Sequence, residues 1–108
     1  MPVPPLPPHD ADDAVWIGLL RFTVATPGVR SLKEKRAQVR PIVDRLRRRY
    51  PVSVARIGGE DRHDEERVAV VVANRDADVC RSVLDKALAS AERDGARLER
   101  VETTVERW

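Results

Sequence analysis

The sequence contains a single cysteine, Cys80, few aromatic residues and no long apolar run. One cysteine cannot form an intramolecular disulfide, which is compatible with a reducing compartment. Apolar stretches of a handful of residues are too short to cross a bilayer, and the prolines of residues 2–8 stand where a signal peptide needs an apolar core. By elimination, the sequence predicts a cytoplasmic protein that has no association with membranes.

The length of 108 residues fits one domain and leaves no room for a second core. Residues 2–8 contain five prolines, and residues 9–13 are mostly acidic. Such a composition buries too little apolar area to offset the entropy of ordering the chain. We therefore expect residues 1–14 to form a disordered proline-rich tail and residues 15–108 to form a single domain.

Apolar periodicity predicts six elements in the order β-α-β-β-α-β. Two right-handed crossovers of this order produce a ferredoxin-like α+β sandwich, in which a four-stranded antiparallel sheet carries both helices on one face. Pro41 falls inside the first helix, where we expect a kink and not a break, because the apolar stripe continues in phase. The predicted strands are 15–24, 52–57, 67–73 and 97–106, and the predicted helices run from 31 to 50 and from 76 to 94.

Alternation in the first strand separates two faces. Trp16, Gly18, Leu20, Phe22 and Val24 are apolar throughout and are expected to face the helices. The other face loses its apolar character after Leu19. It would meet solvent or a partner, with Arg21 and Thr23 at its rim. Its predicted interface residues are Val15, Ile17 and Leu19, joined by Val68, Val70 and Val72 or by Ala69, Val71 and Ala73. Because exposed apolar strips are often interaction sites, a homodimer through this face is one expectation.

Positive charge is concentrated in the first helix. Residues 30–49 hold nine basic residues against two acids, a net +7 in a chain whose total is +2. Ser31 and Glu34 have the spacing of a capping box. Cations near a helix start oppose the helix dipole, and a bound anion would reverse that interaction. The predicted RNA or anion contacts are Arg30, Ser31, Lys33, Lys35, Arg36, Arg40, Arg45, Arg48 and Arg49.

Other known modes of action find little support in the residues. The third strand, Arg67–Ala73, has no aromatic side chain on which an RNA-recognition motif could stack bases. His63 lies among consecutive loop acids, which rarely converge on a metal, and Cys80 falls on the apolar stripe of the second helix. No catalytic constellation is visible, so we expect neither an enzyme nor a metal or other cofactor. A phosphate-handling enzyme stays open as a weaker alternative.

Two segments resemble a known family. The run Ile17–Phe22 (IGLLRF), followed by Pro27–Arg36 (PGVRSLKEKR), is similar to the start of the YlxP-like proteins, a bacterial family of unknown function. The similarity extends over about residues 15–106. It implies the ferredoxin-like fold. It also implies a link to translation, since genes of that family often neighbour those of initiation and ribosome-maturation factors.

Charge and resemblance together indicate a small binding protein that associates with RNA or ribosomal particles through its basic first helix. The main alternative is a protein-interaction module, a homodimer through the open sheet face, with no role in nucleic-acid binding. The two hypotheses require different surfaces of the same domain, so substitutions on each surface can separate them.

Overall fold

Six elements follow one another in the computed structural model, which describes residues 13–108; most of the predicted proline-rich tail lies outside the described residues. No helix in this part of the chain is long and apolar enough to span a membrane. The order β-α-β-β-α-β is as predicted. The elements are β1 (Trp16–Ala25), α1 (Leu32–Arg49), β2 (Ser53–Gly58), β3 (Glu65–Asn74), α2 (Ala77–Arg93) and β4 (Arg97–Arg107).

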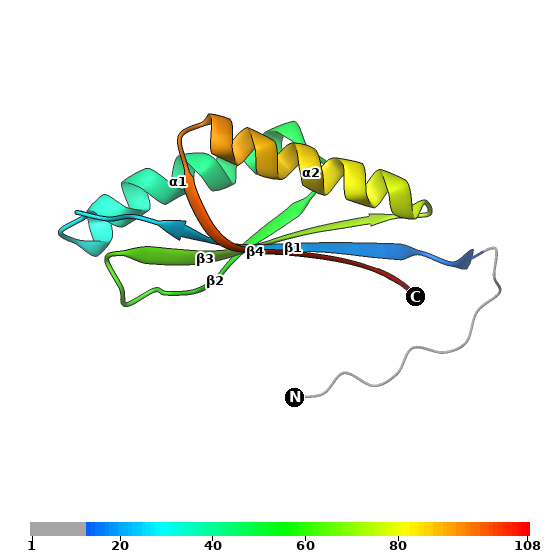
Figure 1. The fold of residues 1–108 in the computed structure, drawn as a ribbon, viewed down its shortest axis with the longest axis horizontal. Coiled ribbons are helices and arrows are strands. Elements are labelled where there is room, and N and C mark those ends of the chain that lie inside the picture. Colours follow the sequence, from blue (N-terminus) through cyan, green and yellow to red (C-terminus); the bar gives the residue numbers. More distant parts are fainter. Residues whose placement is uncertain (1–12) are drawn as a thin grey trace.

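The strands form one antiparallel sheet in the order β2-β3-β1-β4. Both helices lie on the same face of this sheet, and within residues 13–108 the opposite face carries no helix (Figure 1). The predicted ferredoxin-like α+β fold is confirmed. Its consequence for function is that the molecule offers two separate surfaces, the outer side of the helices and the open face of the sheet.

The core lies between the sheet and the helices. Leu20, Phe22 and Val24 of β1 are buried there, as the alternation predicted. Gly18, on the same face, lets α2 approach closely. A Cβ atom at Gly18 would come 2.9 Å from Leu84 Cδ1 and 3.0 Å from Val72 Cγ1. The glycine therefore leaves room for the side chains of Leu84 and Val72 in the packing of α2 on the sheet.

The helix α1 is amphipathic, with Val39, Ile42, Val43 and Leu46 buried against the sheet. It runs as one helix through Pro41, as predicted. The largest departure from the predicted elements is in β3, which begins two residues earlier than expected, at Glu65. The reason lies in an ion-pair network that holds Glu66 in the interior beside the start of the strand.

Candidate functional site

The first turn of α1 is capped by the side chains of Ser31 and Glu34. Ser31 has an extended backbone, and its Oγ accepts a hydrogen bond of 3.1 Å from the backbone N–H of Glu34. In return, Glu34 Oε2 accepts a hydrogen bond of 2.6 Å from the backbone N–H of Arg30. This is the predicted capping box. Because the Ser31 hydroxyl caps the helix and the Glu34 carboxylate occupies this end, the expected anion contact through Ser31 is not supported.

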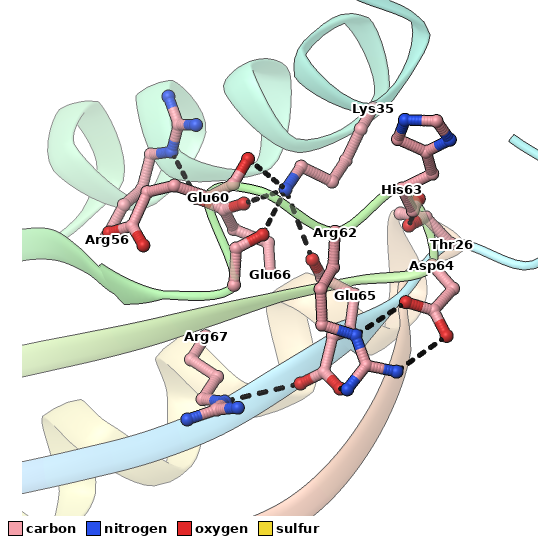
Figure 2. A network of polar contacts seen from close by, with 11 residues as sticks. Thr26, Lys35, Arg56, Glu60, Arg62, His63, Asp64, Glu65, Glu66 and Arg67 are labelled. Atoms are coloured by element: carbon pink, nitrogen blue, oxygen red, sulfur yellow. Dashed lines mark hydrogen bonds and ion pairs between the residues drawn. The ribbon is translucent and has the colours of Figure 1, made fainter. Parts of the chain in front are cut away.

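Lys35 is buried, which corrects its prediction as a phosphate contact. Its side chain is 1% exposed, and Nζ lies 2.7 Å from Glu66 Oε2 (Figure 2). The same ammonium group donates hydrogen bonds to the carbonyl oxygens of Gly59 at 2.6 Å and Glu65 at 3.2 Å. An ammonium group whose three protons are taken up inside the protein cannot reach a ligand at the surface.

Glu66 is the centre of this network. Its side chain is fully buried, and its Oε1 accepts a hydrogen bond of 2.6 Å from Arg56 Nε. Oε2 lacks a hydrogen bond of ordinary geometry and is held by the charge of Lys35. Burial raises the pKa of Glu66, but the close contacts and positive charges of Lys35 and Arg56 lower it by more, so the pKa lies below its ordinary value. The Glu66 carboxyl is therefore ionised at neutral pH.

The β2–β3 connection is built to receive Lys35. Gly59 has a φ of +84°, a conformation that favours glycine, and a Cβ atom there would lie 3.0 Å from the carbonyl oxygen of Glu65. On the other side, Thr26 Oγ1 donates a hydrogen bond of 2.7 Å to the carbonyl of His63. The connection is thus fastened to both α1 and the end of β1. The sequence placed the acids around His63 in a loop, and for Glu65 and Glu66 that prediction is wrong.

A helical-phase argument would have found Lys35. It lies four residues before Val39 and seven before Ile42, on the stripe that faces the sheet. A lysine at that position must be buried or must bend away, and a buried ammonium requires a carboxylate partner. The sequence does not identify the partner, because Glu66 is one of several acids in a charged run.

The outer face of α1 keeps its cations free. Arg30, Lys33, Arg36 and Arg40 are exposed, and none of them forms an ion pair with another residue in the range 13–108. The last three, together with Ala37 and Pro41, line a shallow depression of about 300 Å³. These cations are therefore available to an external anion.

The predicted anion contacts at the end of α1, Arg45, Arg48 and Arg49, divide into two groups. Arg45 Nη1 and Arg49 Nη1 lie 3.3 and 3.5 Å from Asp94 Oδ2, and Arg49 also donates a hydrogen bond of 2.9 Å to Ser90 Oγ. These two side chains connect α1 to the end of α2, so their predicted role as anion contacts is at most secondary. Arg48 is exposed and has no ion pair within the described residues.

The open sheet face carries the predicted apolar strip in a weaker form. Ile17 and Leu19 are half-buried there, paired in register with Ala73 and Val71. The structure decides between the two predicted sets of β3, since Val68, Val70 and Val72 are buried under the helices. Val15 precedes β1 and exchanges backbone hydrogen bonds with Trp108. Thr23, expected at the exposed rim, is only 5% exposed.

Among residues 13–108, no group of three or more His, Cys, Asp or Glu side chains is placed to hold a metal ion. Cys80 is fully buried in the core, where its Sγ lies 3.6 Å from the carbonyl oxygen of Trp16. The described surfaces thus offer charge on α1 and an apolar strip on the sheet as the places where a partner could bind.

Comparisons with known proteins add a family and a structural likeness. No curated protein matches the chain. The solved structures similar to it include the de novo designed protein Foldit4, at 17% sequence identity, covering 87% of this chain and 96% of the designed one, with a TM-score of 0.47.

The family model that matches residues 17–105 is that of DUF503, a protein family of unknown function. This match corrects the assignment to the YlxP-like family, which rested on short segments such as Ser31–Arg36. Those residues form a capping box and bury Lys35, so the needs of the fold explain much of the motif. Because the match covers most of the chain, the protein belongs to the DUF503 family.

Proposed function

We propose that the protein binds RNA through the basic face of α1, defined as Arg30, Lys33, Arg36, Arg40 and Arg48. The observation that carries this proposal is that all five side chains are exposed and none forms an ion pair within residues 13–108. The ribosomal part of the earlier expectation depended on the YlxP-like resemblance and is withdrawn with it. The proposed role is binding without catalysis, and it assumes the cytoplasmic location expected from the sequence.

The distribution of acids supports the proposal. The chain has 18 acidic residues, enough to neutralise most of its 20 cations. Other arginines, on α1 as well as outside it, have acidic partners, as in the contacts of Arg47 with Asp44 and of Arg62 with Asp64. Near the start of α1 the helix dipole already disfavours Lys33 and Arg36. Three or more phosphates along this face would turn an unfavourable local field into a favourable one.

The shape of the basic face suggests how RNA would be read. Lys33, Arg36 and Arg40 follow the spacing i, i+3, i+7, which places them along about 10 Å of one helix side at about 1.5 Å per residue. The face has no aromatic residue on which a base could stack. Contacts would therefore go to backbone phosphates, so binding should depend on RNA shape and salt more than on base sequence.

The experiment compares two triple variants that remove equal charge. One replaces Lys33, Arg36 and Arg40 with Gln; the matched control replaces Arg75, Lys86 and Arg93, which are exposed, have no ion pair within the described residues and lie on or next to α2. Binding of a structured RNA is measured as a function of salt. The first variant should reduce the slope of log affinity against log salt by about 2, at about 0.7 per phosphate contact. An equal reduction of the slope in the control would show that the effect depends only on net charge, and this would overturn the proposal.

A homodimer through the open sheet face is the second candidate, favoured by the apolar pairs of Ile17 with Ala73 and Leu19 with Val71. One patch can serve both subunits of a two-fold dimer. Sedimentation at micromolar concentration tests it. Leu19→Glu should dissociate a dimer, whereas Val79→Glu, on the exposed side of α2, should not. A wild-type monomer under these conditions would rule the candidate out.

A further inference from the structure

A small hollow lies on the sheet, on the side opposite the basic face of α1. Its volume is about 200 Å³. The sheet register shows why it belongs to the open side: Leu20, Phe22 and Val24 point into the core, so Arg21 and Thr23 point the other way. Its lining residues include Arg21 and Thr23 from β1, Ile57 from β2, Arg67 from β3, and Arg100 and Glu102 from β4.

The three arginines converge because their strands are neighbours. Thr23 of β1 pairs with Arg67 of β3, so Arg67 is a diagonal neighbour of Arg21. On the other side, Arg21 pairs with Glu102 of β4. The hollow is thus lined by arginines from three adjacent strands of the sheet.

Arg100 owes its place to an irregular backbone. Its φ is +53°, the one positive value for a residue other than glycine within residues 13–108. The β1–β4 register shifts at this point, between Arg21 and Thr23. Such bulges change the direction of a side chain and occur often beside binding sites. A left-handed conformation is unfavourable for an arginine, and residues held in this way cluster at ligand sites.

The charges of the hollow are not balanced within the described part of the molecule. Arg21 and Arg100 form no ion pair with any residue in 13–108, even though Glu102 stands directly across from Arg21. Arg67 has one partner, with its Nε 3.2 Å from Glu65 Oε2. Neighbouring like charges on a sheet are destabilising. Three guanidinium groups, with the carboxylates of Glu102 and of Glu65, the partner of Arg67, leave an excess of about one positive charge for an anion to neutralise.

We propose that this hollow binds the terminal phosphate of a small phosphomonoester. Guanidinium groups bind phosphate oxygens with paired hydrogen bonds, and a terminal phosphate carries a charge of about −1.5 to −2 at neutral pH. The volume admits a phosphate and few further atoms. Ile57, 42% exposed at the edge of the hollow, offers an apolar contact to the remainder of the ligand. The site is independent of the RNA proposal, because the sheet separates it from α1.

The test follows backbone and arginine side-chain NMR signals of the full chain during titration. The probes are inorganic phosphate, a nucleoside 5′-monophosphate, and a short single-stranded RNA without terminal phosphate. The first two should shift the signals of Arg21, Thr23 and Arg100 with saturation. The RNA should leave these signals in place, whether or not it shifts those of α1, so the two proposals fail separately.

Two variants carry the same test further. Arg100→Asn removes the guanidinium while Asn tolerates the left-handed backbone, and Arg107→Asn removes an exposed arginine of β4 that does not line the hollow. Arg100→Asn should weaken phosphate binding at least tenfold, and Arg107→Asn should leave it within twofold. Absence of saturable shifts at the hollow would overturn the proposal, as would equal weakening by both variants or a stronger response to the RNA lacking a terminal phosphate.

Discussion

Lys33 and Lys35 stand two positions apart on α1 and lie in opposite surroundings. Lys33 is exposed and has no ion pair in the described residues, whereas Lys35 is buried against Glu66 and donates to backbone carbonyls. The two lysines add the same charge to the helix. The rotation of about 100° per residue, however, places them on opposite sides of it. Basic residues on a helix must therefore be sorted by helical phase before any of them is assigned to a ligand.

The largest expected effect is the difference in stability between Lys35→Met and Lys33→Met. Methionine keeps the length of the side chain and removes its charge and donors. Lys35→Met leaves Glu66 with one cation and the carbonyls of Gly59 and Glu65 without this donor, so the free energy of unfolding should fall by about 3 to 5 kcal/mol. Lys33→Met should change it by about 0.5 kcal/mol or less. Denaturant unfolding measures both, and similar losses would show that Lys35 is not a structural lysine.

Lowering the pH should selectively weaken the contact of the buried Lys35 with Glu66. The pKa of Glu66 is lower in the folded protein than in the unfolded chain, so its carboxylate stabilises the fold above the unfolded pKa, about 4.3. That contribution is lost as the pH falls through the lower, folded value. Thermal unfolding between pH 7 and pH 3 should show a steeper loss for the wild type than for Glu66→Gln, which cannot titrate. Parallel curves would contradict the role given to Glu66.

The smallest effect should appear at the end of α1, where Arg48 and Arg49 repeat the contrast. Arg49 contacts Asp94 and Ser90, while Arg48 has no ion pair in the described residues. Arg49→Gln should lower the free energy of unfolding by about 0.5 to 1 kcal/mol, the usual range for a partly exposed pair, and Arg48→Gln should leave it unchanged. On RNA binding the order should be reversed, with Arg48→Gln the more damaging substitution. If Arg49→Gln weakened RNA binding and Arg48→Gln did not, the RNA contact would belong to Arg49 and not to Arg48.

The fold could be predicted from the sequence because apolar periodicity follows backbone geometry, as the alternation of β1 and the stripe of α1 show. The start of β3 could not be predicted, because Glu65 and Glu66 belong to a charged run typical of loops. Only the contact of Glu66 with Lys35 explains why they are buried in a strand. The partners of Arg45 and Arg49 at Asp94 depend on how the helices pack, a property of the assembled molecule. Nothing in the sequence indicates the left-handed backbone of Arg100, so the hollow beside it was not predicted.

The contacts of Lys35 also have a dynamic consequence. One ammonium group joins α1 to the β2–β3 connection, and Thr26 joins the same connection to β1. Local opening of that connection would break the contacts of Lys35 and leave its buried ammonium group without partners, which is costly. The residues around Gly59 should therefore open together with the first turns of α1 as one cooperative unit. In amide hydrogen exchange, a segment with the composition of a solvated loop would then show the slow exchange of a core element.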